Sequence, residues 1–146
     1  MLEVEKVNFQ IQSLELTESS FKHPVKKAIS DKEVFRFNLN LEHLIDSGQE
    51  TLIVKIQVDI LAESSEEIVG VIKSNVVFKI LNLFNYFKDN KPGLPDILIT
   101  TLNSISISTT RGMMFSAFRG TFLHNATLPL IDPTFKSDNR SNNINS

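Results

Sequence analysis

Residues 35–60, FRFNLNLEHLIDSGQETLIVKIQVDI, contain two runs in which apolar and polar residues alternate. Alternation at every second position is typical of a strand with one buried face. The two runs flank residues 46–49, DSGQ, a combination that favours a tight turn. The segment therefore predicts an antiparallel hairpin with one apolar face.

Two further strands are predicted outside this hairpin. In residues 9–16, FQIQSLEL, the apolar positions change phase between Ile11 and Leu14, which predicts a strand with a bulge. A polar turn, ESSE at residues 63–66, separates the hairpin from residues 67–80. This last run is rich in β-branched residues and has apolar residues at both parities, so its buried face is ambiguous and both faces could be covered.

The pattern becomes helical after residue 80. Leu81, Phe84 and Phe87 are spaced like a short helical turn. Residues 91–95, KPGLP, interrupt this turn, and Asp96 directly after them is expected to be the N-cap of a second helix.

The second helix is expected to be long. Apolar residues roughly follow helical spacing from Asp96 to Phe118, which predicts a rod of roughly 35 Å. Its middle, residues 104–110, is rich in serine and threonine and is a poor helix former. These small side chains and Gly112 would allow another backbone to approach closely, such as that of a second copy of the chain.

Length and composition predict one domain, residues 1–135, and a polar tail, residues 136–146. The chain has 146 residues, of which 41% are hydrophobic and 22% charged, enough for a single core. The tail, KSDNRSNNINS, is expected to be disordered because it cannot offset its ordering entropy by burial.

Charge, hydropathy and the lack of cysteine indicate which partners and which cellular compartment are expected. The formal net charge of -2 provides no basic field for nucleic acid, and no apolar run is long enough to insert into a membrane. The chain has no cysteine, and its first residues do not follow the plan of a secretory signal. A cytoplasmic location is therefore expected.

The order of these elements and three short motifs resemble the SecB family of protein-export chaperones. The motifs are FQIQSLEL at residues 9–16, FRFNLNLE at residues 35–42 and FRGTF at residues 118–122, where the long helix ends. The resemblance covers residues 7 to about 133. It implies an α+β fold, a four-stranded antiparallel sheet with one long helix packed on it, assembled as a homotetramer that is a dimer of dimers.

The resemblance also implies an ATP-independent holdase that binds unfolded or precursor polypeptides in apolar grooves, for protein export. It assigns Phe37, Leu39 and Leu41 to the groove and Phe122 to its border. Methionine and phenylalanine offer adaptable apolar contact area. On that ground the client-binding set extends to Phe35, Met113, Met114, Phe115 and Phe118.

Two differences from the family leave alternatives open. The family usually has a second amphipathic helix and an acidic tail associated with docking on the SecA motor, and residues 134–146 contain neither, so docking on SecA is doubtful. A dedicated SecB-like chaperone of one partner, such as the antitoxin of a toxin–antitoxin module, is one alternative. Another is a structural or regulatory homo-oligomeric module. The alternating residues 35–41 are also compatible with an ordinary core.

Catalytic and cofactor motifs are not visible. His23, His43 and His124 lack metal-ligand spacing, and the five glycines are too dispersed for a phosphate-binding loop. The sequence therefore predicts no enzyme, cofactor or metal site.

The remaining charged groups have structural explanations. Glu63, Glu66 and Glu67 on a predicted turn are expected to form a solvated charge group. Arg111 and Arg119 are eight residues apart on one side of the predicted helix, and surface or intersubunit ion pairs are expected there.

Overall fold

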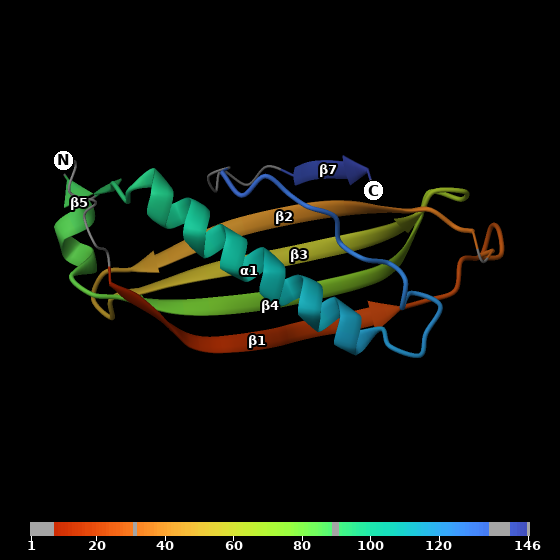
Figure 1. Ribbon diagram of the computed structural model, residues 1–146, viewed down its shortest axis with the longest axis horizontal. Coiled ribbons are helices and arrows are strands. Elements are labelled where there is room, and N and C mark those ends of the chain that lie inside the picture. Colours follow the sequence, from red (N-terminus) through yellow and green to blue (C-terminus); the bar gives the residue numbers. More distant parts are fainter. Residues whose placement is uncertain (1–7, 31, 89–90, 135–140, 146) are drawn as a thin grey trace.

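The computed structural model describes residues 8–30, 32–88, 91–134 and 141–145. One long helix crosses one face of an antiparallel sheet diagonally (Figure 1). This arrangement confirms the expected α+β class. The sheet and helix consist of β1 (Phe9–Phe21), β2 (Phe35–Asp46), β3 (Thr51–Ala62), β4 (Glu67–Ile80) and α1 (Asp96–Ala117).

The strand order is β1-β4-β3-β2, and a fifth strand, β7 (Ser141–Asn145), pairs with the outer edge of β2. The predicted hairpin is confirmed, because β2 and β3 stay in continuous register up to the pair Asp46 and Thr51. Oδ1 of Asp46 accepts hydrogen bonds from the backbone N–H groups of Gly48 at 3.0 Å and Gln49 at 3.2 Å. This local bonding explains why DSGQ forms the turn.

The predicted bulge in β1 is also confirmed. The register against β4 shifts between Ile11 and Ser13. The shift places Ile11 opposite Phe78 and Leu14 opposite Val76, so both apolar runs of β1 lie on the face that carries α1. A second shift follows further along the strand, between Leu16 and Glu18.

β4 lies in the centre of the sheet, between β1 and β3. Its alternate residues, including Ile72 and Val76, are buried under α1, whereas Val71 and Val77 on the opposite face are half-buried. β4 therefore has apolar residues at both odd and even positions because one of its faces is fully buried and the other is partly covered.

The start of α1 differs from the prediction. Pro95 is the N-cap, and Asp96, predicted for that position, is instead the first helical residue. The backbone N–H groups of Leu98 and Ile99 bond to the carbonyl of Pro95 at 3.0 and 3.2 Å. The proline carbonyl can accept these bonds because the extended conformation of Pro95 points it into the helix, so no side-chain cap forms.

The middle of α1 is helical despite its weak propensity, because it packs on the sheet. Ser106 and Thr110 are buried, and their hydroxyls bond to the carbonyls four residues earlier at 2.7 and 2.8 Å. The Thr110 hydroxyl also lies 2.7 Å from the hydroxyl of Ser74 on β4. The small side chains thus bring α1 close to its own sheet.

Short elements connect β4 to α1. The expected helical turn is a 3-10 helix, η1 (Leu83–Tyr86), with Leu83 buried. It is followed by a small hairpin of β5 (Phe87–Lys88) and β6 (Lys91–Pro92).

After α1, residues 120–134, here called the exit segment, return over the sheet toward β2 (Figure 1). Its Leu123 and Leu128 join the core. Arg111, expected in an ion pair, instead donates from Nε to the carbonyl of Leu128 and from Nη2 to that of Pro129, both at 2.8 Å. Arg111 therefore holds the exit segment against α1.

The tail differs in part from the expected disorder. Residues 141–145 form β7, whereas residues 136–140 and 146 lie outside the described part of the chain, as does the domain boundary predicted at residue 135. A strand can form here because an edge strand offers backbone donors and acceptors to any extended segment, whatever its side chains.

Candidate client-binding surface

The nine residues predicted to bind clients fall into two groups. The exposed group is small: Met113 and Phe122 are half-buried, and Phe115 is 67% exposed. The buried residues lie on β2, on α1 and at the end of α1, between the sheet and the helix. They are Phe35, Phe37, Leu39, Leu41, Met114 and Phe118, all at most 8% exposed. In the single chain these six side chains are core, and their contact with clients stays a prediction.

A cavity of about 830 Å³ lies at one end of the sheet, between the β1–β2 connection and the turn after α1. It brings together two of the predicted residues, Phe35 and Phe122. The connection contributes His23, Pro24 and Ile29 to the lining. We call this feature the aromatic cavity.

Aromatic rings pack around Phe122, which lines the aromatic cavity together with His23, whereas Phe21 and Phe118 lie outside the lining. Phe21 lies edge-on to Phe118 and Phe122, with ring centroids 6.3 and 5.9 Å apart. The imidazole of His23 lies 4.7 Å from the Phe122 ring, tilted by 30°. Each edge-on pair contributes about 0.5–1.5 kcal/mol beyond burial, which helps to position the Phe122 ring.

Two carboxylates fix the connection that borders the cavity. Glu67 accepts hydrogen bonds from the backbone N–H groups of Val25 at 2.9 Å and Lys26 at 2.6 Å. These bonds, aided by nearby lysine charge, hold the pKa of Glu67 below its ordinary value. Glu33 accepts from the backbone and hydroxyl of Ser64. Glu67 thus remains accessible to solvent, as expected of the charge group formed by the glutamates of residues 63–67, and in addition anchors the connection.

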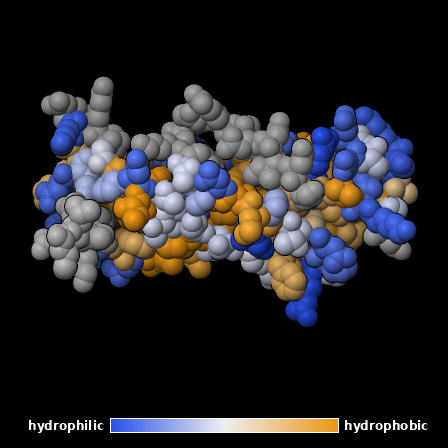
Figure 2. Space-filling model, turned by 45° about the horizontal axis from the view of Figure 1, so that its top comes forward, coloured by the Kyte–Doolittle hydropathy of each residue, from blue (hydrophilic) through white to orange (hydrophobic). Residues whose placement is uncertain are grey.

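Apolar residues of β1 form a second exposed surface, the β1 strip, defined as Ile11, Leu14 and Leu16. Each is about half exposed and lies on the face that carries α1. They remain uncovered because α1 begins near β2 and reaches β1 only at its far end (Figure 1). Figure 2 shows hydrophobic surface along the middle of the molecule, interrupted by polar side chains.

The outward side of α1 continues this surface. Ile97, near the start of the helix, is 69% exposed, and Phe115, near its end, is 67% exposed. Ser104, Ser108 and Gly112 between them are exposed, and a Cβ at Gly112 would meet no atom within 4 Å. This side of α1 could therefore accept a closely packed backbone.

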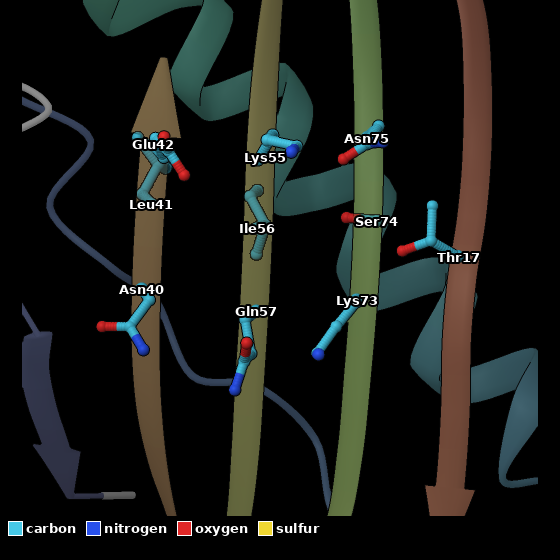
Figure 3. Close-up of a pocket in the computed structure, with 10 residues that line it drawn as sticks. All are labelled: Thr17, Asn40, Leu41, Glu42, Lys55, Ile56, Gln57, Lys73, Ser74 and Asn75. Carbon is cyan, nitrogen blue, oxygen red and sulfur yellow. The ribbon is translucent and has the colours of Figure 1, made fainter. Parts of the chain in front are cut away.

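The opposite sheet face, here called the open face, is polar. Figure 3 shows the sheet with α1 behind it, and Asn40, Gln57, Lys73 and Asn75 project toward the viewer around a hollow of about 600 Å³. Lys73 pairs with Glu18 at 4.0 Å. Charges and amides are mixed on this face with a few partly exposed apolar residues, such as Val71 and Val77, so it offers less continuous apolar contact area than the β1 strip.

The histidines do not form a catalytic group. His43 lies on β2, where its Nε2 is 2.7 Å from Oδ1 of the fully buried Asn103, and Asn103 donates from Nδ2 to the carbonyl of Pro133 at 2.8 Å. Burial lowers the pKa of His43, which its bond to Asn103 partly opposes. Among the described residues, no cluster of histidines and carboxylates is placed to hold a metal ion.

Sequence reasoning missed His23 as a residue that lines the aromatic cavity, and Phe21 as a ring that packs on Phe122. They lie where the alternation of β1 ends, and nothing local shows that they meet residues 118–122. An aromatic residue at the end of an edge strand was the only signal.

No protein-family model and no curated protein matches the sequence. Among solved structures, the chain is similar to the Mycobacterium tuberculosis Rv1957 SecB-like chaperone, solved in complex with a ChAD peptide from the Rv1956 HigA1 antitoxin. The TM-score is 0.63 at 13% identity, over 84% of this chain and 89% of that chain. The chain therefore has a SecB-like fold. None of the described helices is long and apolar enough to cross a membrane.

Proposed function

We propose that this chain is an ATP-independent holdase that binds unfolded or precursor polypeptides. The observation that carries the proposal is the aromatic cavity, an open site with apolar residues such as Phe35 and Phe122 among polar ones, on a SecB-like fold. Its volume lies within the range of sites that enclose small ligands, so it can take large apolar side chains of an extended client. Affinity would come from burial, at about 25 cal/mol per Å² of apolar area.

The buried members of the predicted set would act at a later stage. Phe37, Leu39 and Leu41 lie beneath α1 and the exit segment, whose contacts with Arg111 and Asn103 hold it in place. We propose that the faces of these three residues that lie beneath the exit segment contact a client only when that segment moves aside, whereas Phe122 and Phe115 are accessible from the start.

We further propose that the chain assembles in the cytoplasm as a homotetramer, a dimer of dimers. The β1 strip and the outward side of α1 adjoin on one face, and together they expose more apolar surface than single scattered side chains would. A second copy would cover them. Light scattering after size exclusion should give four times the chain mass, and a stable monomer would contradict this assembly.

The proposed holdase could act in protein export, or it could be a dedicated chaperone of one partner protein. The similar structure was solved with an antitoxin peptide bound, which favours a dedicated chaperone of one partner. Binding measured against a panel of unrelated unfolded proteins separates them, since a dedicated chaperone should bind few of the panel.

Suppression of aggregation tests the proposed function. At stoichiometric ratio and without ATP, the chain should suppress aggregation of reduced, unfolding α-lactalbumin. Ala28→Trp would fill the aromatic cavity, and Val25→Trp places the same ring in the same connection but outside the cavity lining, where Val25 is 89% exposed. Only Ala28→Trp should reduce suppression. Equal activity of both variants would remove the cavity from the mechanism, and no suppression by the unaltered chain would end the proposal.

A further inference from the structure

The outer edge of β2 is occupied by the end of the same chain. β7 pairs antiparallel with Arg36–Asn40, with Asn145 opposite Arg36 and Ser141 opposite Asn40. Without β7, β2 would be an edge strand with unpaired backbone groups along its whole length. Such an edge accepts any extended backbone of suitable direction.

The sequence of β7, SNNIN, gives this pairing little support beyond its backbone hydrogen bonds. Asparagine and serine are unfavourable in strands, and the sequence has one apolar residue. The register places Ile144 opposite Phe37, whereas the polar Asn142 is opposite the apolar Leu39. A strand with apolar residues at both positions would pair better, because cross-strand apolar pairs add about 0.2–1 kcal/mol each.

β7 covers only part of the edge. β2 runs from Phe35 to Asp46, and in the described part of the chain no strand pairs with its outer edge beyond Asn40. An incoming segment could form its first backbone hydrogen bonds beside Leu41–Asp46. It could then extend toward Arg36 and displace β7 one residue at a time.

We propose that the β2 edge is a strand-addition site for extended polypeptides and that residues 141–145 are its resident, displaceable occupant. This inference rests on the proposed function and specifies how the client backbone is held. The favoured client segment alternates apolar and polar residues, with apolar residues opposite Phe37, Leu39 and Leu41. Main-chain pairing supplies affinity and the alternate positions supply selectivity, as in other cases of strand addition.

The connection to β7 explains why the chain occupies its own edge. Only residues 135–140 separate the described end of the exit segment from β7. A short connection gives an effective concentration on the order of millimolar, so even a weak strand shields the edge against pairing between copies. A client with a better sequence can still replace it.

A reversible lock tests the displacement. The chain has no cysteine, so Asn38→Cys with Asn143→Cys introduces one pair at positions that are directly opposite in the register. Opposite residues of antiparallel strands are about 4.5–5.5 Å apart between Cα atoms, which suits a disulfide. Failure of this disulfide to form under mild oxidation would show that β7 does not occupy the edge, and would overturn the inference.

The binding probe is carboxymethylated, permanently unfolded α-lactalbumin. If β7 occupies the edge about nine tenths of the time, a chain truncated after Thr134 should bind the probe about tenfold more tightly than the full chain. The oxidised double variant should bind at least about tenfold more weakly, and reduction should restore full-chain affinity. Equal affinity of the oxidised, reduced and truncated forms would overturn the inference while leaving the holdase function intact.

Hydrogen exchange separates the remaining outcomes. On binding the probe, the amides of residues 141–145 should lose protection while those of Arg36–Asn40 keep it, because the client replaces β7. Unchanged protection of residues 141–145 would overturn the strand exchange. If the truncated chain forms a larger assembly and gains no affinity, the edge pairs with a second copy and the inference fails. No binding by any form would remove both the inference and the proposed function.

Discussion

Replacement of Asn103 by leucine should destabilise the chain, because this buried amide joins three elements. Asn103 accepts a hydrogen bond from His43 on β2 and donates one to the carbonyl of Pro133 in the exit segment. Leucine has a similar size but makes neither bond. An unsatisfied buried polar group costs about 1–3 kcal/mol, and because the two groups left on His43 and Pro133 are only part-buried, the free energy of unfolding should fall by about 1–3 kcal/mol in total.

Urea unfolding followed by circular dichroism, at fixed protein concentration, measures this loss. Asn85→Leu is the matched control, because Asn85 is exposed on η1 and lies outside the helix side proposed to meet a second copy, and it should change stability by less than about 0.5 kcal/mol. A double-mutant cycle with His43→Leu should give a coupling above about 0.5 kcal/mol. If Asn103→Leu costs no more than the control, the amide does not tie the exit segment to α1 and β2, and the reasoning is refuted.

Three further predictions concern other contacts. Because burial lowers the pKa of His43, folding stability is complete above about its ordinary value of 6.5 and is lost as pH falls below it; His43→Gln should flatten this loss between about pH 7 and 5 in urea titrations. Glu67→Ala removes the acceptor of two backbone bonds and should speed hydrogen exchange in residues 22–30; unchanged exchange would contradict that anchoring. Gly70→Ala would place a Cβ 2.7 Å from Cδ1 of Leu123 and should cost about 1–3 kcal/mol in the same assay, whereas Gly112→Ala should not destabilise the single chain.

The main sheet was predictable because its signal is local. The alternation in residues 35–60 specifies both strands of the hairpin and the face they bury. The change of phase between Ile11 and Leu14 likewise indicated the bulge in β1. A strand with one buried and one solvent-exposed face produces an alternating sequence pattern that does not depend on the rest of the chain.

The contacts of α1 were harder to predict because they depend on distant residues. Ser106 and Thr110 weaken the local helix preference, and only the hydroxyl of Ser74 on β4 shows why they occur there. In the same way, Arg111 is explained by two carbonyls of the exit segment. Tertiary packing overrides local preference at Ser106 and Thr110.

The candidate site was predicted only in part. Phe35 and Phe122 line the aromatic cavity as one would expect of site residues, but Phe37 and Leu39 are almost completely buried in the single chain. Alternation shows that a side chain faces inward and does not show whether a core or a groove lies there. β7 left no pattern at all, because its pairing uses the backbone.

Selective binding of an unfolded polypeptide is the central claim. The most direct measurement compares the affinity of the chain for carboxymethylated, unfolded α-lactalbumin and for native α-lactalbumin by fluorescence anisotropy, without nucleotide. The account predicts saturable binding of the unfolded form alone, reduced by Ala28→Trp and unchanged by Val25→Trp. Equal binding of both forms, or no binding of the unfolded form with the chain in excess, would contradict it.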